Sequence, residues 1–359
     1  MRGALPLVLL VVAAGCVAPA ALRPAAEAAC VEPHPCGPHW PEGLTGPFAL
    51  RDILHERVPV NGVVLDGDVY LPDVPAGTRV PVVLWAHPYF GQTYPDASSE
   101  DVREGAHGLP VARLVAEGYA VAAFNVRGSG ASSGCFEMFG PNEGDDLALL
   151  VGWLAEQPWS NGRVGMAGLS YHGTTPWMAA IRQPPALKTI VVAGMVSDLY
   201  TFYHTPQGAV FTIGAPFQAA FDALVSLAPP VRGLPDGRPD PAVVPDRACP
   251  EVVRTFASLA AGTATDERDA AYWDARRILD GFPNVTAAVY LTHGFQDQWG
   301  SGHQQQEDVV WPALDRAPKR MLLGQWAHEF PDRNSHRLDL AVRDWEDRLV
   351  AWLDHWLKG

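Results

Sequence analysis

The chain has 359 residues, of which 48% are hydrophobic and 18% charged, and its formal net charge is −14. This length allows one large α/β domain with an insertion, or two small domains. The acidic balance argues against a nucleic-acid partner, because a protein that binds phosphates needs a basic face that displaces counterions.

The first 29 residues are typical of a secretory signal peptide. Arg2 is followed by an apolar run over residues 4–14 and then by small and proline-rich sequence. The run is too short to span a bilayer, and no later segment approaches the ~20 apolar residues of a transmembrane helix. We therefore expect an exported protein without a transmembrane segment. Residues 26–28 (Ala-Glu-Ala) form one cleavage site, and the alternative is a lipoprotein box that anchors the chain at Cys16.

Cysteine usage also favours an oxidising compartment. Five cysteines are present, and removal of Cys16 with the signal leaves an even number. Four cysteines allow three pairings, and the sequence does not choose among them. We expect at least one disulfide, most simply Cys30–Cys36 or Cys135–Cys249.

Residues 30–49 are expected to be an extended tail. Cys30, His34, Cys36 and His39 have the residue types of a metal site, but their spacing fits no standard zinc pattern. Nearby prolines also keep this stretch extended. We therefore expect no metal site here, and a local disulfide accounts better for the cysteines.

After the tail, apolar runs alternate with helical patterns. Residues 58–72 alternate in polarity and carry turn signals at Asn61-Gly62 and Asp66-Gly67, which predicts a hairpin. Continuous apolar runs are typical of strands buried on both faces. The expected strands are 81–86, 119–126, 163–167, 189–195, 285–292 and 320–324, and the expected helices are 111–117, 147–156, 174–181 and 339–357. This alternation predicts a mainly parallel sheet with helices on both faces.

The pattern changes over residues 200–280. Helical pieces at 217–227, 251–261 and 267–279 surround a proline- and glycine-rich break at 229–250. We interpret this stretch as a helical cap over the site, which leaves residues 50–199 and 281–359 as the α/β domain.

A candidate nucleophile lies where one predicted strand meets a helix. Gly168-Leu169-Ser170-Tyr171-His172-Gly173 has the context of a nucleophile elbow, in which small residues let the chain turn and present the serine hydroxyl. The second glycine stands one residue later than in G-x-S-x-G. A glycine-rich turn without chemistry is the alternative, and we expect Ser170 to be the nucleophile.

Two further polar residues follow later strands. Asp297 comes after the strand at 285–292, and His328 comes after the strand at 320–324. In a parallel sheet, these positions lie at the carboxyl edge with Ser170. An imidazole takes and returns a proton near neutral pH, and a carboxylate holds its working tautomer. His336, the nearest rival base, lies further past its strand, and an ordinary loop role is the alternative for Asp297.

The oxyanion of an acyl-transfer reaction needs hydrogen-bond donors. One is expected to be the backbone N–H of Tyr171, directly after the nucleophile. The other is expected from the loop His87-Pro88-Tyr89, which follows the strand at 81–86.

Several of these segments resemble the X-prolyl dipeptidyl-peptidase/cocaine-esterase family. The resemblance rests on WLAEQPWSNGRVGM at 153–166, the G-x-S-Y-x-G elbow, RGSG at 127–130, the loops of Asp297 and His328, and the ending WLDHWLKG. It covers about residues 50–359. It implies an α/β-hydrolase fold and a serine hydrolase without a cofactor, whose triad is Ser170, His328 and Asp297. It also implies that the Tyr89 hydroxyl is an oxyanion donor.

The chain departs from the family in two respects. Asn125 stands where the family often has Asp before the Arg-Gly pair. Family enzymes also continue into a β-sandwich domain, and this chain stops after the closing helix. We expect the site to be more open as a result, which favours small activated acyl groups.

Other functions have less support. Gly128, Gly130 and Gly134 do not match the spacing of a dinucleotide-binding loop. A non-catalytic binding protein on this fold is expected to lose a triad residue, and here all three are present.

Within enzymes, the alternatives are an esterase or amidase for small acyl compounds and a true X-Pro dipeptidyl-peptidase. The dipeptidyl-peptidase needs a carboxylate for the substrate amine, and Glu137, Glu143 and Asp198 are the candidates. Pocket lining or core packing is open for several aromatic residues, namely Phe202, Tyr203, Phe217, Trp273 and Trp299.

Overall fold

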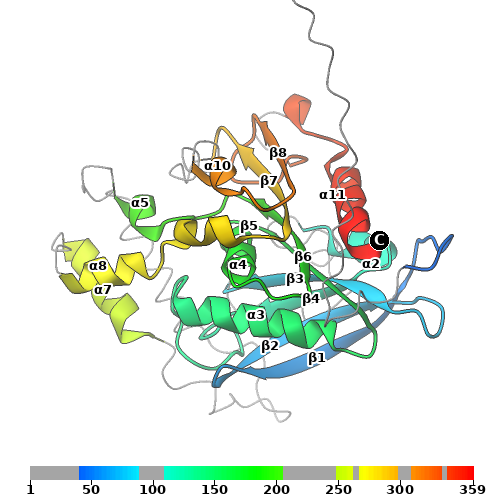
Figure 1. The fold of residues 1–359 in the computed structure, drawn as a ribbon, viewed down its shortest axis with the longest axis horizontal. Coiled ribbons are helices and arrows are strands. Elements are labelled where there is room, and N and C mark those ends of the chain that lie inside the picture. Colours follow the sequence, from blue (N-terminus) through cyan, green and yellow to red (C-terminus); the bar gives the residue numbers. More distant parts are fainter. Residues whose placement is uncertain (1–39, 89–108, 205–247, 262–266, 298–308, 334–337) are drawn as a thin grey trace, which may run out of the picture. The chain divides into compact units, whose positions relative to one another are not determined.

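The structure is a computed structural model that describes residues 40–88, 109–204, 248–261, 267–297, 309–333 and 338–359. Within these residues, an eight-stranded sheet has the order β1-β2-β4-β3-β5-β6-β7-β8 (Figure 1). The pairs β1·β2 and β2·β4 are antiparallel, and the other neighbours are parallel. The strands are β1 (Leu50–Val60), β2 (Val63–Pro72), β3 (Val80–His87), β4 (Ala120–Asn125), β5 (Ser160–Leu169), β6 (Leu187–Ala193), β7 (Ala288–Gly294) and β8 (Lys319–Gly324).

Helices cover both faces of the sheet, as predicted. The side chains of β3 alternate between two cores, one on each face of the sheet. Val82 and Leu84 pack with α3 (Pro141–Ala155) and α4 (Tyr171–Ala180). Trp85 packs with α2 (Val111–Ala116) and α11 (Trp345–Leu353). A strand buried on both faces therefore explains the continuous apolar run in the sequence. The predicted α/β-hydrolase architecture, a mainly parallel sheet between two helical layers, is confirmed.

The first two strands form the predicted hairpin, but only one of its two turn signals marks a turn. Asn61 and Gly62 connect β1 to β2 with φ angles of 40° and 78°, and both angles lie in the left-handed region that a tight hairpin turn needs. The prediction of a turn at Asp66-Gly67 is wrong, since both residues lie inside β2. Gly67 pairs with Phe124 of β4, and an added Cβ would lie 2.4 Å from that ring. Close packing, not a turn, requires this glycine.

The bounds of two helices differ from the predicted ones by six residues or more. α3 begins at Pro141, six residues before the predicted start, because proline is well suited to the first turn of a helix. The predicted helix at 339–357 is interrupted. A short η4 (Leu338–Leu340) precedes it, α11 begins only at Trp345, and the chain ends in η5 (Asp354–Lys358). The backbone N–H of Val342, between η4 and α11, donates to Pro331 O at 2.8 Å. This hydrogen bond to a loop replaces the one that a continuous helix would make.

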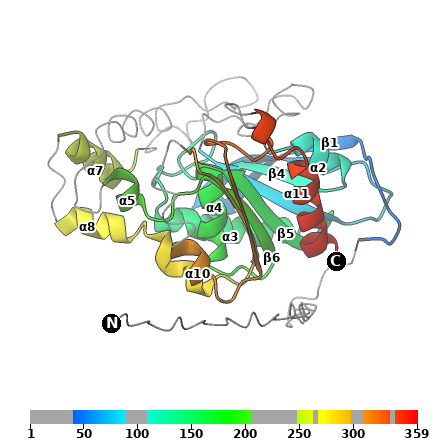
Figure 2. The same ribbon diagram turned by 90° about the horizontal axis from the view of Figure 1, so that it is seen from above.

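The segment between β6 and β7 carries α5 (Leu199–Tyr203), α7 (Pro250–Ala261), α8 (Glu267–Asp274) and η2 (Ile278–Asn284). α5, α7 and α8 lie together in both views (Figures 1 and 2). Tyr203 is their common contact, with ring centroids 5.6 Å from Phe256 and 6.1 Å from Trp273. Tyr203 and Trp273 are therefore core residues of this group. The helix predicted at 217–227, with Phe217, lies outside the described residues, as does Trp299.

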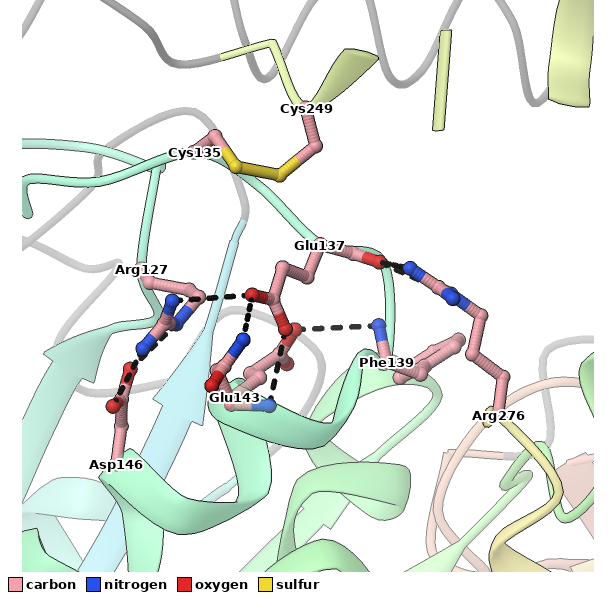
Figure 3. Close-up of a disulfide and its surroundings, with 9 residues drawn as sticks. Arg127, Cys135, Glu137, Phe139, Glu143, Asp146, Cys249 and Arg276 are labelled. Carbon is pink, nitrogen blue, oxygen red and sulfur yellow. Dashed lines mark hydrogen bonds and ion pairs between the residues drawn. A yellow bond between two sulfur atoms is a disulfide. The ribbon is translucent and has the colours of Figure 1, made fainter. Parts of the chain in front are cut away.

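A disulfide joins this helical group to the loop after β4. Cys135 and Cys249 are bonded, with Cα atoms 5.0 Å apart, and Cys249 directly precedes α7 (Figure 3). The Cys135–Cys249 prediction is confirmed, whereas Cys30 and Cys36 lie outside the described residues. In the part of the chain that the structure describes, no helix combines the length and apolar character needed to cross a bilayer.

Candidate active site

Ser170 lies in a strained turn between β5 and α4. Its φ and ψ are 68° and −125°, and a residue with a side chain rarely adopts such a positive φ. Ser170 is half-buried, and its backbone N–H donates to Ala193 O, at the end of β6, at 3.0 Å. This is the backbone geometry that a nucleophile elbow uses to present a hydroxyl at the end of a strand.

The positions of the two glycines in this turn have a steric reason. An added Cβ at Gly168 would lie 2.3 Å from the Cβ of His172, and one at Gly173 would lie 2.2 Å from Ala193 O. The close approach to β6 therefore falls at Gly173, the glycine that stands one residue later than in G-x-S-x-G. His172 takes the usual glycine position with its side chain buried and stacked on Trp85, at a centroid distance of 4.6 Å. His172 is a packing residue here.

Asp297 and His328 are in direct contact. The Nδ1 of His328 donates to Oδ2 of Asp297 at 2.8 Å, and both side chains are largely buried, with exposed fractions of 12% and 3%. The same carboxylate oxygen lies 4.0 Å from Nδ1 of His293, on β7. Asp297 thus lies between two imidazoles, and the shorter contact is with the predicted base. His336 lies outside the described residues.

The end of β6 brings the elbow and the Asp-His pair together. The Ser170 backbone N–H is hydrogen-bonded to Ala193 O. The next residue, Gly194, lies against the Asp-His pair. An added Cβ at Gly194 would be 3.0 Å from Nδ1 of His328 and 3.1 Å from Oδ2 of Asp297. A larger side chain at Gly194 would push the pair away. Gly194 belongs to no motif in the sequence, and only the structure reveals its role.

The expected oxyanion donor Tyr171 is the first residue of α4. N–H groups in the first turn of a helix point out of its N-terminus, where the helix dipole favours negative charge. Tyr89, the second expected donor, lies outside the described residues, directly beyond the part of the β3 loop that the structure describes.

All three carboxylates considered for a substrate amine are hydrogen-bonded to protein groups. Glu137 accepts from Nη1 of Arg127 at 3.1 Å and from Nδ2 of Asn142 at 2.6 Å (Figure 3). Asp198 caps α5 by accepting from the Tyr200 backbone N–H at 2.9 Å. The third, Glu143, accepts from the side chain of Tyr171. Each of the three therefore has a structural role.

The Arg-Gly motif after β4 also has a structural role. Arg127 is buried and donates to both carboxylate oxygens of Asp146, at 2.7 and 2.8 Å, besides Glu137 (Figure 3). A bidentate pair of this kind fixes both side chains. Within the described ranges, no group of three His, Cys, Asp or Glu residues could hold a metal ion, and the cluster from Cys30 to His39 lies outside them.

The sequence of this chain is similar to one protein family over most of its length. The family described as X-Pro dipeptidyl-peptidase (S15 family) matches residues 61–329. A putative Xaa-Pro dipeptidyl-peptidase of Bacillus anthracis is 27% identical over 340 residues, which cover 86% of this chain and 51% of that protein. The cocaine esterase of Rhodococcus sp. (strain MB1 Bresler) is 27% identical over 299 residues, which cover 77% of this chain and 49% of that protein. The chain spans about half the length of these relatives.

Solved structures are similar in fold. A CocE/NonD family hydrolase from Staphylococcus aureus has a TM-score of 0.60 at 17% identity, over 85% of this chain and 50% of that chain. An alpha-amino acid ester hydrolase has a TM-score of 0.53 at 21% identity, over 85% of this chain and 54% of that chain. At these identities the likeness concerns the fold.

Proposed function

Because the chain belongs to the X-Pro dipeptidyl-peptidase (S15) family and is a serine hydrolase, we propose that it cleaves acyl ester or amide bonds with the triad Ser170, His328 and Asp297. The observation that carries the proposal is the 2.8 Å hydrogen bond between His328 and Asp297, beside the strand end to which Ser170 is bonded. An imidazole held in one tautomer next to an elbow serine is the arrangement that acyl transfer needs.

The proposed reaction proceeds through an acyl-enzyme. Oγ of Ser170 attacks the carbonyl carbon, and its proton passes to Nε2 of His328. Asp297 stabilises the imidazolium, while the Tyr171 N–H and, by family resemblance, the Tyr89 hydroxyl stabilise the oxyanion. The tetrahedral intermediate then expels the alcohol or amine, which takes the proton from His328. Water repeats the sequence and releases the acid.

Within this chemistry, we favour small esters over X-Pro peptides. A dipeptidyl-peptidase recognises the free amine of its substrate, which needs a carboxylate that faces the pocket. Among the described residues, the three carboxylates considered for this role are bonded to protein groups instead. An ester also has the better leaving group and requires less of His328 as general acid.

We expect kcat/KM for p-nitrophenyl butyrate to exceed kcat/KM for Gly-Pro-p-nitroanilide by at least about tenfold, a difference of ~1.4 kcal/mol in transition-state stabilisation. Both substrates release a chromophore, so one spectrophotometric assay on the full chain compares them directly, with Ser170→Ala as the blank. A preference for the Gly-Pro amide would make the protein a dipeptidyl-peptidase and overturn this ordering.

Export is the second part of the proposal, and the Cys135–Cys249 disulfide supports it, because disulfides persist in oxidising compartments. We expect the protein in the extracytoplasmic fraction to contain this bond. The double variant Cys135→Ser/Cys249→Ser is expected to lose ~2–4 kcal/mol in free energy of unfolding, since the bond restricts the unfolded chain. Thermal unfolding with and without reductant measures the loss.

Reductant is expected to lower the melting temperature of the parent protein and to leave that of the double variant unchanged. The mass of the recovered chain distinguishes cleavage at residues 26–28 from a lipidated Cys16. Recovery of the protein only in the cytoplasm, with both thiols free, would contradict the proposal.

A further inference from the structure

A buried carboxyl lies against the residue that follows the nucleophile. Glu143, in the first turn of α3, is fully buried. Its Oε2 accepts a hydrogen bond from the Tyr171 hydroxyl at 2.9 Å and another from the Phe139 backbone N–H at 3.2 Å. One carboxyl oxygen therefore connects α3, the start of α4 and the segment that precedes α3.

The side chain of Tyr171 is held at its hydroxyl and at its ring. It is 4% exposed, its ring stacks on Phe139 at a centroid distance of 4.0 Å, and Phe136 packs at 5.8 Å. The Phe139 backbone N–H also donates to the Tyr171 hydroxyl at 3.1 Å. Because the tyrosine ring is rigid, fixing its hydroxyl also fixes the backbone to which it is attached.

The segment that carries Phe139 is itself held from the opposite side. Arg276 is buried and donates to the backbone carbonyls of Glu137 and Met138 at 2.7 and 3.1 Å, and the disulfide holds Cys135 (Figure 3). Met138 and Phe139 have φ angles of 50° and 62°, which residues with side chains rarely adopt. These contacts keep the segment pressed against Tyr171 and Glu143.

We propose that Glu143 is a positioning residue: through the Tyr171 hydroxyl, it fixes the backbone N–H that stabilises the oxyanion beside Ser170. This inference rests on the proposed function, because the position of that N–H affects the rate only if Ser170 is acylated. Glu143 has no direct contact with substrate in this scheme. It acts from the protein interior, behind the elbow.

The charge of Glu143 makes the role testable. Burial raises the pKa of Glu143 to about 8. The Tyr171 hydrogen bond and the positive charge of Arg127 lower this pKa, while the carboxylates of Glu137 and Asp146 raise it further. Below pH 8 Glu143 is therefore neutral and adds no negative charge of its own behind the oxyanion.

Ionisation above that pH places a buried negative charge near the developing oxyanion. Two like charges about 10 Å apart, at an effective dielectric constant near 20, repel enough to slow a reaction roughly tenfold. We therefore expect kcat for p-nitrophenyl butyrate to fall roughly tenfold as the pH rises through the pKa of Glu143. The acidic limb of the profile belongs to the general base, which must be neutral to accept the serine proton.

The central experiment compares pH profiles of kcat in the full chain. Glu143→Gln keeps the oxygen that accepts from Tyr171 and Phe139 but cannot ionise, so we expect near-parental kcat at pH 7 and no fall at alkaline pH. Tyr171→Phe keeps the ring and the backbone N–H but loses the link, so we expect a roughly tenfold lower kcat with little change in KM. The matched control is Asp145→Asn, which removes an exposed carboxylate of the same helix that pairs with Arg182. It should keep the alkaline fall.

Two further measurements separate the possible failures. The infrared band of a neutral carboxyl should vanish from the parent protein near pH 8 and be absent in Glu143→Gln, independently of activity. Labelling by a fluorophosphonate tests Ser170 itself. If the variants are labelled and Glu143→Gln keeps the alkaline fall, or Tyr171→Phe keeps full kcat, the role of Glu143 is overturned and the proposed function stands. If the parent protein is neither labelled nor active on esters, the proposed function fails, and the inference fails with it.

Discussion

Replacement of Ser170 by alanine is expected to lower kcat by about 10⁶ and to abolish labelling by a fluorophosphonate, because it removes the hydroxyl that we propose as the nucleophile. The elbow itself should survive, since its shape depends on the close approaches at Gly168 and Gly173, which the substitution leaves intact. The measurement is single-turnover and steady-state hydrolysis of p-nitrophenyl butyrate, with the probe as an independent readout. Labelling of Ser170→Ala at the parental rate would remove Ser170 from the mechanism.

Ser170→Gly is the informative companion to this variant. Glycine adopts the φ of 68° without the steric conflict that a Cβ brings. We expect it to be as inactive as the alanine variant but more stable by about 1 kcal/mol, the usual scale of strain at such a position. Equal stability of the two variants would show that the elbow is not strained.

Asp297→Asn is expected to lower kcat by about 10⁴ with little change in stability. The amide keeps the size of the side chain, but its donor group favours the wrong tautomer of His328 and leaves the imidazolium without a counter-charge. The contact affected is the 2.8 Å hydrogen bond from Nδ1 of His328. The measurement is kcat for p-nitrophenyl butyrate at neutral pH, beside a thermal unfolding curve.

An exposed carboxylate provides the control for this variant. Asp274 is 67% exposed and pairs with Arg277 at the surface, so Asp274→Asn should keep parental activity. A loss below about tenfold in Asp297→Asn would mean that another group orients His328. The nearby His293 cannot supply the missing charge, because it is itself a base.

The sheet was predictable because its signals are local. Apolar runs such as 81–86 and 189–195 are buried on both faces of a parallel sheet, and the structure has β3 and β6 there. Gly67 shows the limit of such reasoning: beside Asp66 it has the sequence of a turn, but its place against Phe124 depends on a strand more than fifty residues away. A local pattern does not contain that contact.

Some residues of the candidate site could be predicted from the sequence, and others could not. The elbow and the strand-end positions of Asp297 and His328 follow from motif and topology, and the structure has the last two in contact. Gly194 could not be predicted, because its role depends on the space left by Asp297 and His328, which lie in the loops after two other strands. Glu143 was considered for a substrate amine, and only the packing of α3 against α4 reveals its bond to Tyr171.

The Cys135–Cys249 bond has a consequence for the order of events during biosynthesis. Its partners are 114 residues apart, so at ~5–20 residues per second Cys249 is made roughly 6–23 s after Cys135. During that interval Cys135 is a thiol whose partner does not yet exist, while Cys30 and Cys36 have already been made. Early pairing of Cys30 with Cys36 would keep both away from Cys135, whereas oxidation of Cys135 before that pairing would give mispaired chains. We therefore expect correct maturation to need the local Cys30–Cys36 pair first, or an isomerase that reopens early bonds.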